Sequence, residues 1–104
     1  MLERKWTDDP NPWTPMTEPQ DIQVLGKFAE ELGECVSVCA RCLIQGIDET
    51  EPSTGKSNRV WLEEEIADVL ANLLLTCDRY NLDMVAIDKR VIFKMEYLKR
   101  WHNL

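Results

Sequence analysis

The stretch Lys27-Phe-Ala-Glu30-Glu31-Leu-Gly-Glu34 decides how this chain folds, together with Glu63-Glu64-Glu65-Ile-Ala-Asp68 further along. Each stretch places carboxylates three residues apart within a pattern of apolar residues that is typical of an amphipathic helix. Side chains at this spacing on a helix point in a similar direction, so each pair can reach one ion. Two such pairs on facing helices would form a cage of carboxylates for a hard divalent cation.

Apolar residues recur at steps of three and four throughout the chain and predict an all-α fold with three helices. The first helix is expected to begin near Gln20, with Thr17-Glu-Pro-Gln as its start and Thr17 as the capping residue, and to end near Gly46. The second begins near Asn58, and Asp83 is a suitable N-cap for the third. The apolar stripe of the first helix comprises Ile22, Leu25, Phe28, Ala29, Leu32, Cys35, Val36, Cys39 and Leu43. That of the second comprises Leu62, Ile66, Val69, Leu70, Leu73, Leu74 and Cys77, and that of the third comprises Met84, Ile87, Val91, Met95 and Leu98.

The chain divides into an arm, residues 1–20, and a helical domain, residues 21–104. The arm holds four of the five prolines and two of the four tryptophans. Proline removes backbone donors and restricts the preceding residue, so the arm should be extended, with its indoles packed on an apolar surface. Residues 46–58 are polar and contain Gly and Pro, which predicts a loop; its length makes it a candidate mobile lid.

Size and charge exclude several classes of function. A chain of 104 residues has room for one domain, and a net charge of −7 does not attract nucleic acid or an anionic membrane. No apolar run reaches the roughly 20 residues of a membrane span, and the first residues lack a signal-peptide core, which favours the cytoplasm. The four cysteines are then expected to be free thiols.

The predicted helices cannot shield one another completely at this size. A chain this short buries roughly 65% of its unfolded surface, so a monomeric core would be thin. Four apolar residues fall outside the main stripes, namely Ile44, Ala71, Leu75 and Ile92. We therefore expect a second subunit to cover them and to complete the helical bundle, as a homodimer or homotetramer.

The acids alone allow two interpretations. Glu and Asp on helices are commonly solubilising, and one Glu-x-x-Glu means little. Here, however, two such motifs border the apolar stripes of neighbouring helices, where carboxylates would repel one another unless a positive charge lay between them. Oxygen ligands without histidine favour Mg²⁺ or Mn²⁺ over Zn²⁺.

Glu30-Glu31-Leu-Gly-Glu34 followed by Glu65-Ile-Ala-Asp68 resembles the signature of the all-α nucleoside triphosphate pyrophosphohydrolases, which include MazG-like proteins, dimeric dUTPases and dCTP pyrophosphatases. The resemblance covers roughly residues 21–101. It includes Lys94-Met-Glu-Tyr-Leu-Lys-Arg100-Trp, which is similar to the basic segment that closes MazG-like domains. The resemblance implies a Mg²⁺-dependent enzyme that converts a nucleoside triphosphate, expected to be a deoxynucleotide, into the monophosphate and pyrophosphate for nucleotide-pool housecleaning.

The resemblance also implies roles for individual residues. Four carboxylates match the Mg²⁺ ligands, with Mn²⁺ as a possible substitute: Glu31, Glu34, Glu65 and Asp68. Glu30 completes the first motif and would orient or deprotonate the attacking water. Lys94 and Arg100 match the phosphate-binding positions. The chain departs from the family in a long gap between the acidic motifs, in Leu98 where an asparagine is frequent, and in the arm that replaces a preceding helix.

Substrate recognition remains open at two positions. Asn72 lies one turn beyond Asp68 and can bond a sugar or base, or simply a neighbouring polar group. Trp61 can stack on a base or pack as an ordinary core residue.

Two further alternatives remain open. Cys35, Cys39, Cys42 and Cys77, with His102, allow a Zn²⁺ site or plain packing by small hydrophobic residues. The alternative to an enzyme is a non-catalytic acidic helical protein that binds a partner or a nucleotide.

Overall fold

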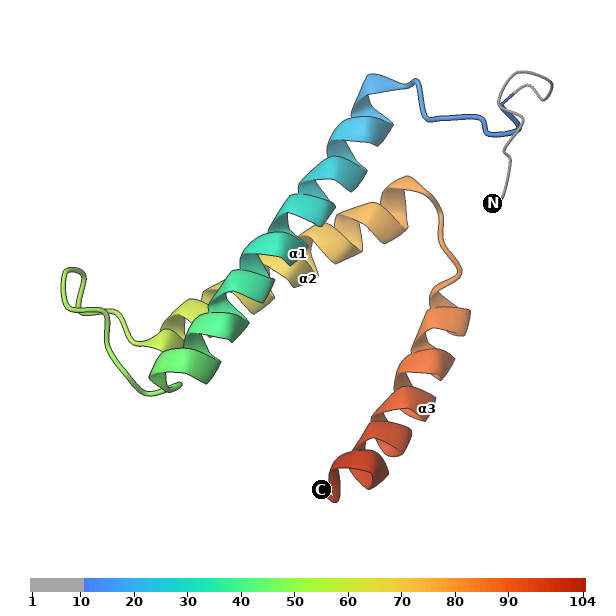
Figure 1. Ribbon diagram of the computed structural model, residues 1–104. Helices are drawn as coiled ribbons and strands as arrows, with labels where there is room; N and C mark the ends of the chain where they lie inside the picture. Colours follow the sequence, from blue (N-terminus) through green and yellow to red (C-terminus); the bar gives the residue numbers. More distant parts are fainter. Residues whose placement is uncertain (1–10) are drawn as a thin grey trace, which may run out of the picture.

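The computed structural model describes residues 11–104. The predictions for Trp6 and Pro10 in the arm lie outside the described residues. Residues 11–18 contain no helix or strand and are exposed. The chain then forms α1 (Pro19–Gln45), α2 (Asn58–Arg79) and α3 (Met84–His102) (Figure 1). Within residues 11–104 there is no strand longer than a single bridge, so the all-α prediction is confirmed.

The helix ends follow from local chemistry. Pro19 opens α1, and the Glu18 side chain caps it by accepting a hydrogen bond from the Asp21 amide at 2.7 Å, one residue later than the predicted Thr17. The Ser57 hydroxyl caps α2. Asp83 caps α3 as predicted, with the Ala86 amide donating at 3.0 Å. Capping at these positions explains why the helix boundaries lie close to those expected from the sequence.

Helices α1 and α2 lie side by side as an antiparallel hairpin (Figure 1). The residues between them recur at steps of three and four, which is the spacing of a coiled-coil seam. Every one of them is buried or half-buried. The seam consists of Val24, Phe28, Glu31, Cys35, Val38 and Cys42 of α1, and Asn58, Leu62, Glu65, Val69, Asn72 and Thr76 of α2.

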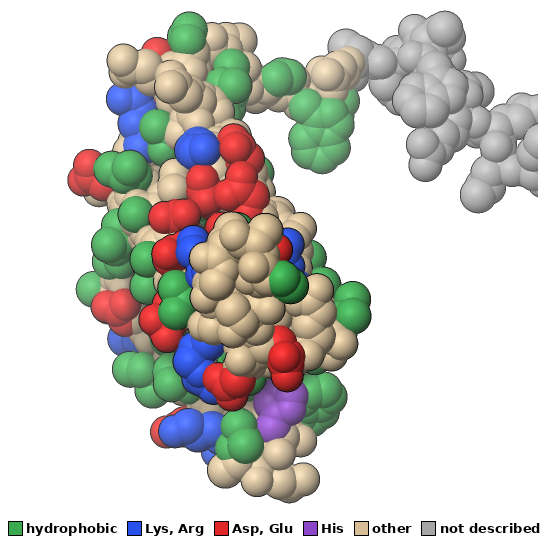
Figure 2. Space-filling model, turned by 90° about the vertical axis from the view of Figure 1, so that its left-hand side faces the viewer, with side chains coloured by type: hydrophobic (Ala, Val, Ile, Leu, Met, Phe, Trp, Pro, Cys, Tyr) green, Lys and Arg blue, Asp and Glu red, His purple; other side chains and the backbone are tan. Residues whose placement is uncertain are grey.

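A second apolar stripe on α1 lies outside this seam. It contains Ile22, Leu25, Leu32, Val36 and Leu43, of which Val36 is 68% and Leu43 is 88% exposed. On α2 the predicted buried residues Ile66, Leu70 and Leu74 are likewise exposed. The prediction that these residues are buried is therefore wrong for a single chain, because the sequence pattern merges two faces of each helix into one stripe. Hydrophobic side chains remain visible at the surface in Figure 2.

Helix α3 extends away from the hairpin (Figure 1). None of its residues is buried. The radius of gyration is 19.4 Å, against about 13 Å for a compact domain of this length. In the described part of the chain, no helix is both long and apolar enough to cross a membrane.

The open end of the hairpin is closed by charged and aromatic groups. The Arg79 guanidinium donates to Asp21 at 2.6 Å and to Glu18 at 2.8 Å. The Tyr80 hydroxyl donates to the Asp21 carbonyl. These contacts attach the start of α1 to the end of α2 and fix the register of the two helices.

The loop between α1 and α2 has its own hydrogen-bond network. Thr50 and Ser57 form an isolated antiparallel bridge. The Glu51 carboxylate accepts hydrogen bonds from the hydroxyls and amides of Ser53 and Thr54, and these bonds lower the pKa of Glu51 to about 2. Gly55, at φ 72°, provides the left-handed turn. The lid expected from the sequence is thus a folded turn attached to the start of α2.

Asn58 connects this turn to the hairpin. It is 1% exposed, and its Nδ2 donates to the Gly46 carbonyl at 2.9 Å and to Gln45 Oε1 at 3.2 Å. We expect Asn58→Ala to lower the free energy of unfolding by about 1–3 kcal/mol, because two buried hydrogen bonds from Nδ2, each worth about 0.5–1.5 kcal/mol, are lost, although the Gly46 carbonyl still accepts from the Glu49 amide at 3.3 Å. Denaturant unfolding would measure this. An equal loss for Arg59→Ala, at an exposed neighbouring position, would contradict a specific role for Asn58.

Candidate metal centre

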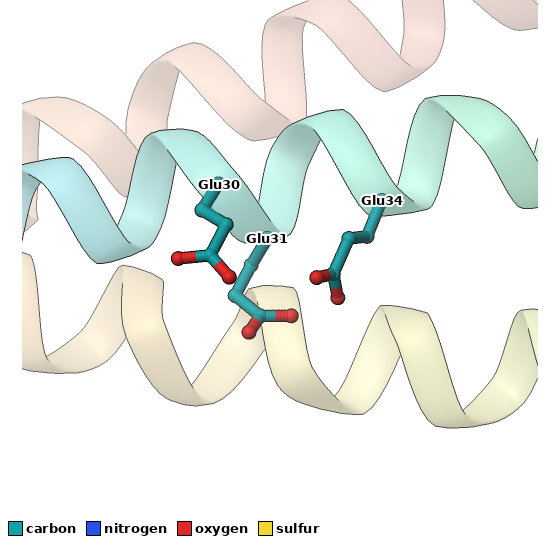
Figure 3. A group of neighbouring side chains, drawn as sticks. All are labelled: Glu30, Glu31 and Glu34. Carbon is teal, nitrogen blue, oxygen red and sulfur yellow. The ribbon is translucent and has the colours of Figure 1, made fainter.

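The middle of the α1–α2 seam contains two overlapping groups of carboxylates. Glu30, Glu31 and Glu34 of α1 form the first, and Glu31 joins Glu65 and Asp68 of α2 in the second; within each group the ligand atoms lie within 4.8 Å of one another. Glu31 belongs to both groups and is 6% exposed. Figure 3 shows the three glutamates of α1 pointing toward α2. The structure therefore places the five predicted acids in two groups that share Glu31, and it does not place the four predicted ligands in one group.

The seam geometry explains this convergence. Glu31 and Glu65 occupy seam positions that would hold apolar residues in an ordinary coiled coil. Glu34 and Asp68 each lie one turn further along their own helix and are exposed. The site consequently has a buried inner edge and an outer edge that faces solvent, which gives an ion and a substrate a route of entry.

Two buried oxygens at this site have no hydrogen-bond partner. They are Glu31 Oε2 and Glu65 Oε2, one from each helix. A buried polar atom without a partner costs about 1–3 kcal/mol, and more when it is charged. Exposed acidic clusters are common without a metal, but unpaired carboxylate oxygens buried between two helices are not explained by solubility.

One cation within the described residues offsets this charge. Lys27 Nζ lies 3.1 Å from Glu31 Oε1 and 3.3 Å from Glu30 Oε1, and these bonds raise the pKa of Lys27. The charge of Glu31, followed by partial burial and by Glu65, raises the pKa of the Glu34 carboxyl. The cluster therefore keeps an excess of negative charge. A hard divalent cation fits a donor set made of carboxylate oxygens.

Asn72 uses its polar groups locally. Its side-chain Nδ2 donates to the backbone carbonyl of Asp68 at 2.8 Å. Its backbone carbonyl accepts a hydrogen bond from the Thr76 hydroxyl at 2.7 Å. The side chain of Asn72 thus bonds to a neighbouring polar group of its own helix, which is one of the two interpretations that the sequence leaves open. Both hydrogen bonds also stiffen the turn of α2 that carries Asp68.

The structure places the other predicted substrate-binding residues differently. Trp61 is half-buried one turn before Glu65, with its indole Nε1 buried and without a partner. Lys94 and Arg100 lie on α3, apart from the acidic cluster, and Lys94 Nζ is 5.5 Å from the Tyr97 ring centroid. Within this chain the acids are assembled, whereas the basic segment is not brought to them.

Sequence reasoning missed three basic residues close to the hairpin seam, namely Lys27, Arg41 and Lys56. Lys27 could have been found from its spacing of three and four residues before Glu30 and Glu31. Arg41 lies seven residues after Glu34 and hence on the same side of α1. Lys56 has no such signal because the conformation of its loop places it.

The cysteines are free, as expected. Cys77 is buried, and burial raises the pKa of the Cys35 thiol, with a smaller effect from Cys39. Across residues 11–104, the groups with metal-binding geometry contain carboxylates and neither cysteine nor histidine.

No family model, curated protein or solved structure matches this chain.

Proposed function

We propose that the protein is a Mg²⁺-dependent nucleoside triphosphate pyrophosphohydrolase, for which Mn²⁺ can substitute. The observation that supports this most strongly is the pair of unpartnered buried oxygens, Glu31 Oε2 and Glu65 Oε2, on facing helices. Two groups of carboxylates surround them. The resemblance of both acidic motifs to the all-α pyrophosphohydrolases adds the reaction class, and the proposed products are a monophosphate and pyrophosphate.

The proposed roles follow the position of each side chain. Glu31 and Glu65 would hold the ion from the buried edge, and Glu34 and Asp68 from the solvent edge. The ion, when bound, would neutralise phosphate charge in the transition state. Rigid helices hold these carboxylates before substrate arrives, so little reorganisation is needed during the reaction.

Glu30 is suited to accept a proton from the attacking water. It is exposed, and one of its oxygens lies 3.3 Å from Lys27 Nζ. In the proposed reaction it accepts a proton from the water that attacks the α-phosphorus. The bond from the α-phosphorus to the bridging oxygen then breaks, and pyrophosphate leaves with the electron pair. No covalent nucleophile is required.

The proposal includes a homo-oligomer, either a dimer or a tetramer. Together with the exposed Ala29 and Cys39, the apolar stripe of α1 has the seam spacing of three and four residues, so it is suited to pair with another helix. Lys94 and Arg100 can meet the phosphates only if α3 packs against a hairpin, either its own or that of a second chain.

A panel of deoxynucleoside and ribonucleoside triphosphates with Mg²⁺, Mn²⁺ or Ca²⁺ tests the proposed function. We expect one or more triphosphates to give the monophosphate and pyrophosphate in Mg²⁺, and no turnover in EDTA. Release of orthophosphate alone, or no turnover with any substrate, would refute it. A non-catalytic interaction protein would also show no rise in melting temperature with Mg²⁺.

A further inference from the structure

A second charged group lies on the same side of the hairpin as the acidic cluster, nearer the loop. On α1, Arg41 follows Glu34 by seven residues; on α2, Trp61 precedes Asp68 by seven. Seven residues are almost two helical turns, so each pair shares a face and is separated by about 10 Å along the helix. Because the helices are antiparallel, both steps lead toward the loop. Arg41 and Trp61 therefore meet there.

Trp61 holds two cations. The Arg41 guanidinium carbon lies 5.2 Å from the indole centroid, and Lys56 Nζ lies 4.2 Å from it. Both distances are in the range of cation–π attraction. Arg41 and Lys56 are each half-buried. The indole thus fixes two basic side chains, one from α1 and one from the loop.

Among residues 11–104, Arg41 has no acidic partner, whereas Lys56 is paired with Glu64 at 2.7 Å. The full sequence contains 19 acidic and 12 basic residues, so acids are in excess. A half-buried arginine that has no carboxylate partner among the described residues has its planar set of donors available for an anion. Guanidinium groups bind phosphate oxygens in a bidentate manner.

We propose that Arg41 and Lys56, held against Trp61, bind the β- and γ-phosphates of the substrate, which leave as pyrophosphate. This inference rests on the proposed function and adds the direction of the substrate: the α-phosphate lies at the carboxylates and the phosphate chain runs toward the loop. A triphosphate chain and two long basic side chains together cover the separation of about 10 Å. Trp61 then positions cations and is not a platform for the base.

Binding of inorganic pyrophosphate in Mg²⁺, measured by calorimetry, tests the inference without requiring turnover. We expect Arg41→Gln and Lys56→Gln each to raise the Kd for pyrophosphate about tenfold or more, since each removes a charge-assisted hydrogen bond. Arg41→Lys should recover part of the affinity. Arg59→Gln is the matched control, because Arg59 is a basic residue of the same end of the hairpin whose guanidinium is bound by Asp48 at 2.8 Å and is not among the cations at the Trp61 ring, so it should bind pyrophosphate as the wild type does.

Two readouts separate this role from a structural one. The circular dichroism spectrum and the Mg²⁺ affinity of Arg41→Gln should equal those of the wild type, which shows that the hairpin and acidic cluster are intact. Unchanged pyrophosphate affinity in both variants, or no pyrophosphate binding by the wild type, would overturn the inference even if nucleotides are hydrolysed. Weakened pyrophosphate binding without hydrolysis of any triphosphate would retain the anion site and refute the proposed function.

Discussion

Replacement of Glu31 by glutamine is expected to abolish Mg²⁺ binding and to reduce hydrolysis at least about 100-fold, while making the metal-free protein more stable. Glu31 belongs to both carboxylate groups, so its loss affects each. Substitution of a residue that only hydrogen-bonds to a metal ligand lowers metal affinity or activity by about 10–100-fold. Substitution of a ligand itself should lower them at least as much. The gain in stability of about 1 kcal/mol follows because glutamine removes a buried charge beside Glu65, while its Oε1 can still accept from Lys27 Nζ, which lies 3.1 Å from Glu31 Oε1.

Thermal unfolding with and without Mg²⁺ measures both effects. At 100 times its Kd, Mg²⁺ should stabilise the wild type by about 2.7 kcal/mol and leave the variant unchanged. Glu63→Gln is the matched control, because Glu63 is an exposed acid of α2 outside both carboxylate groups. A Glu31→Gln variant that is less stable than the wild type in EDTA, yet still stabilised by Mg²⁺, would refute the metal centre.

A charge introduced into the exposed apolar stripe of α1 should also have a large effect, in this case on self-association and helix content. We expect Val36→Glu to prevent formation of the proposed oligomer and to reduce helix content. An uncompensated charge in a packed interface costs about 3–5 kcal/mol, which corresponds to a more than 100-fold weaker association. The hairpin alone is poorly stabilised, because Val38 and Cys77 are the apolar side chains that it buries fully within residues 11–104.

Sedimentation and circular dichroism over a range of protein concentrations measure association and helix content together. The melting temperature of the wild type should rise with concentration, as mass action requires for an oligomer. Leu104→Glu is the control, since Leu104 is 89% exposed at the end of the chain and lies outside the stripe. A wild type that is monomeric at all concentrations, or a Val36→Glu variant that associates normally, would refute the oligomer.

The fold could be predicted because local signals agree along the chain. Pro19, Ser57 and Asp83 mark helix starts, and Gly46, at φ 109°, marks an end. The acidic site was also predictable, since a spacing of three residues brings carboxylates together on any helix. Helical phase places Glu31 nearest the core and Glu34 one step outward, and their burial confirms this order.

The remaining features depend on contacts that a single helix pattern does not encode. Periodicity shows that Leu70 and Val36 are on apolar faces but does not show whether the hairpin or another chain covers them. The pairing of Lys56 with Trp61 depends on the turn organised by Glu51, which involves residues with no periodic signal. Helix α3 buries none of its residues, so its own apolar stripe does not show which surface it packs against.

Hydrolysis in water enriched in ¹⁸O tests the central claim most directly. Mg²⁺, a triphosphate that is turned over and the purified protein are incubated, and the products are identified by mass spectrometry. Attack at the α-phosphorus predicts one ¹⁸O atom in the monophosphate and none in the pyrophosphate. Label in the pyrophosphate, formation of orthophosphate as the primary product, or the absence of Mg²⁺-dependent turnover would contradict it.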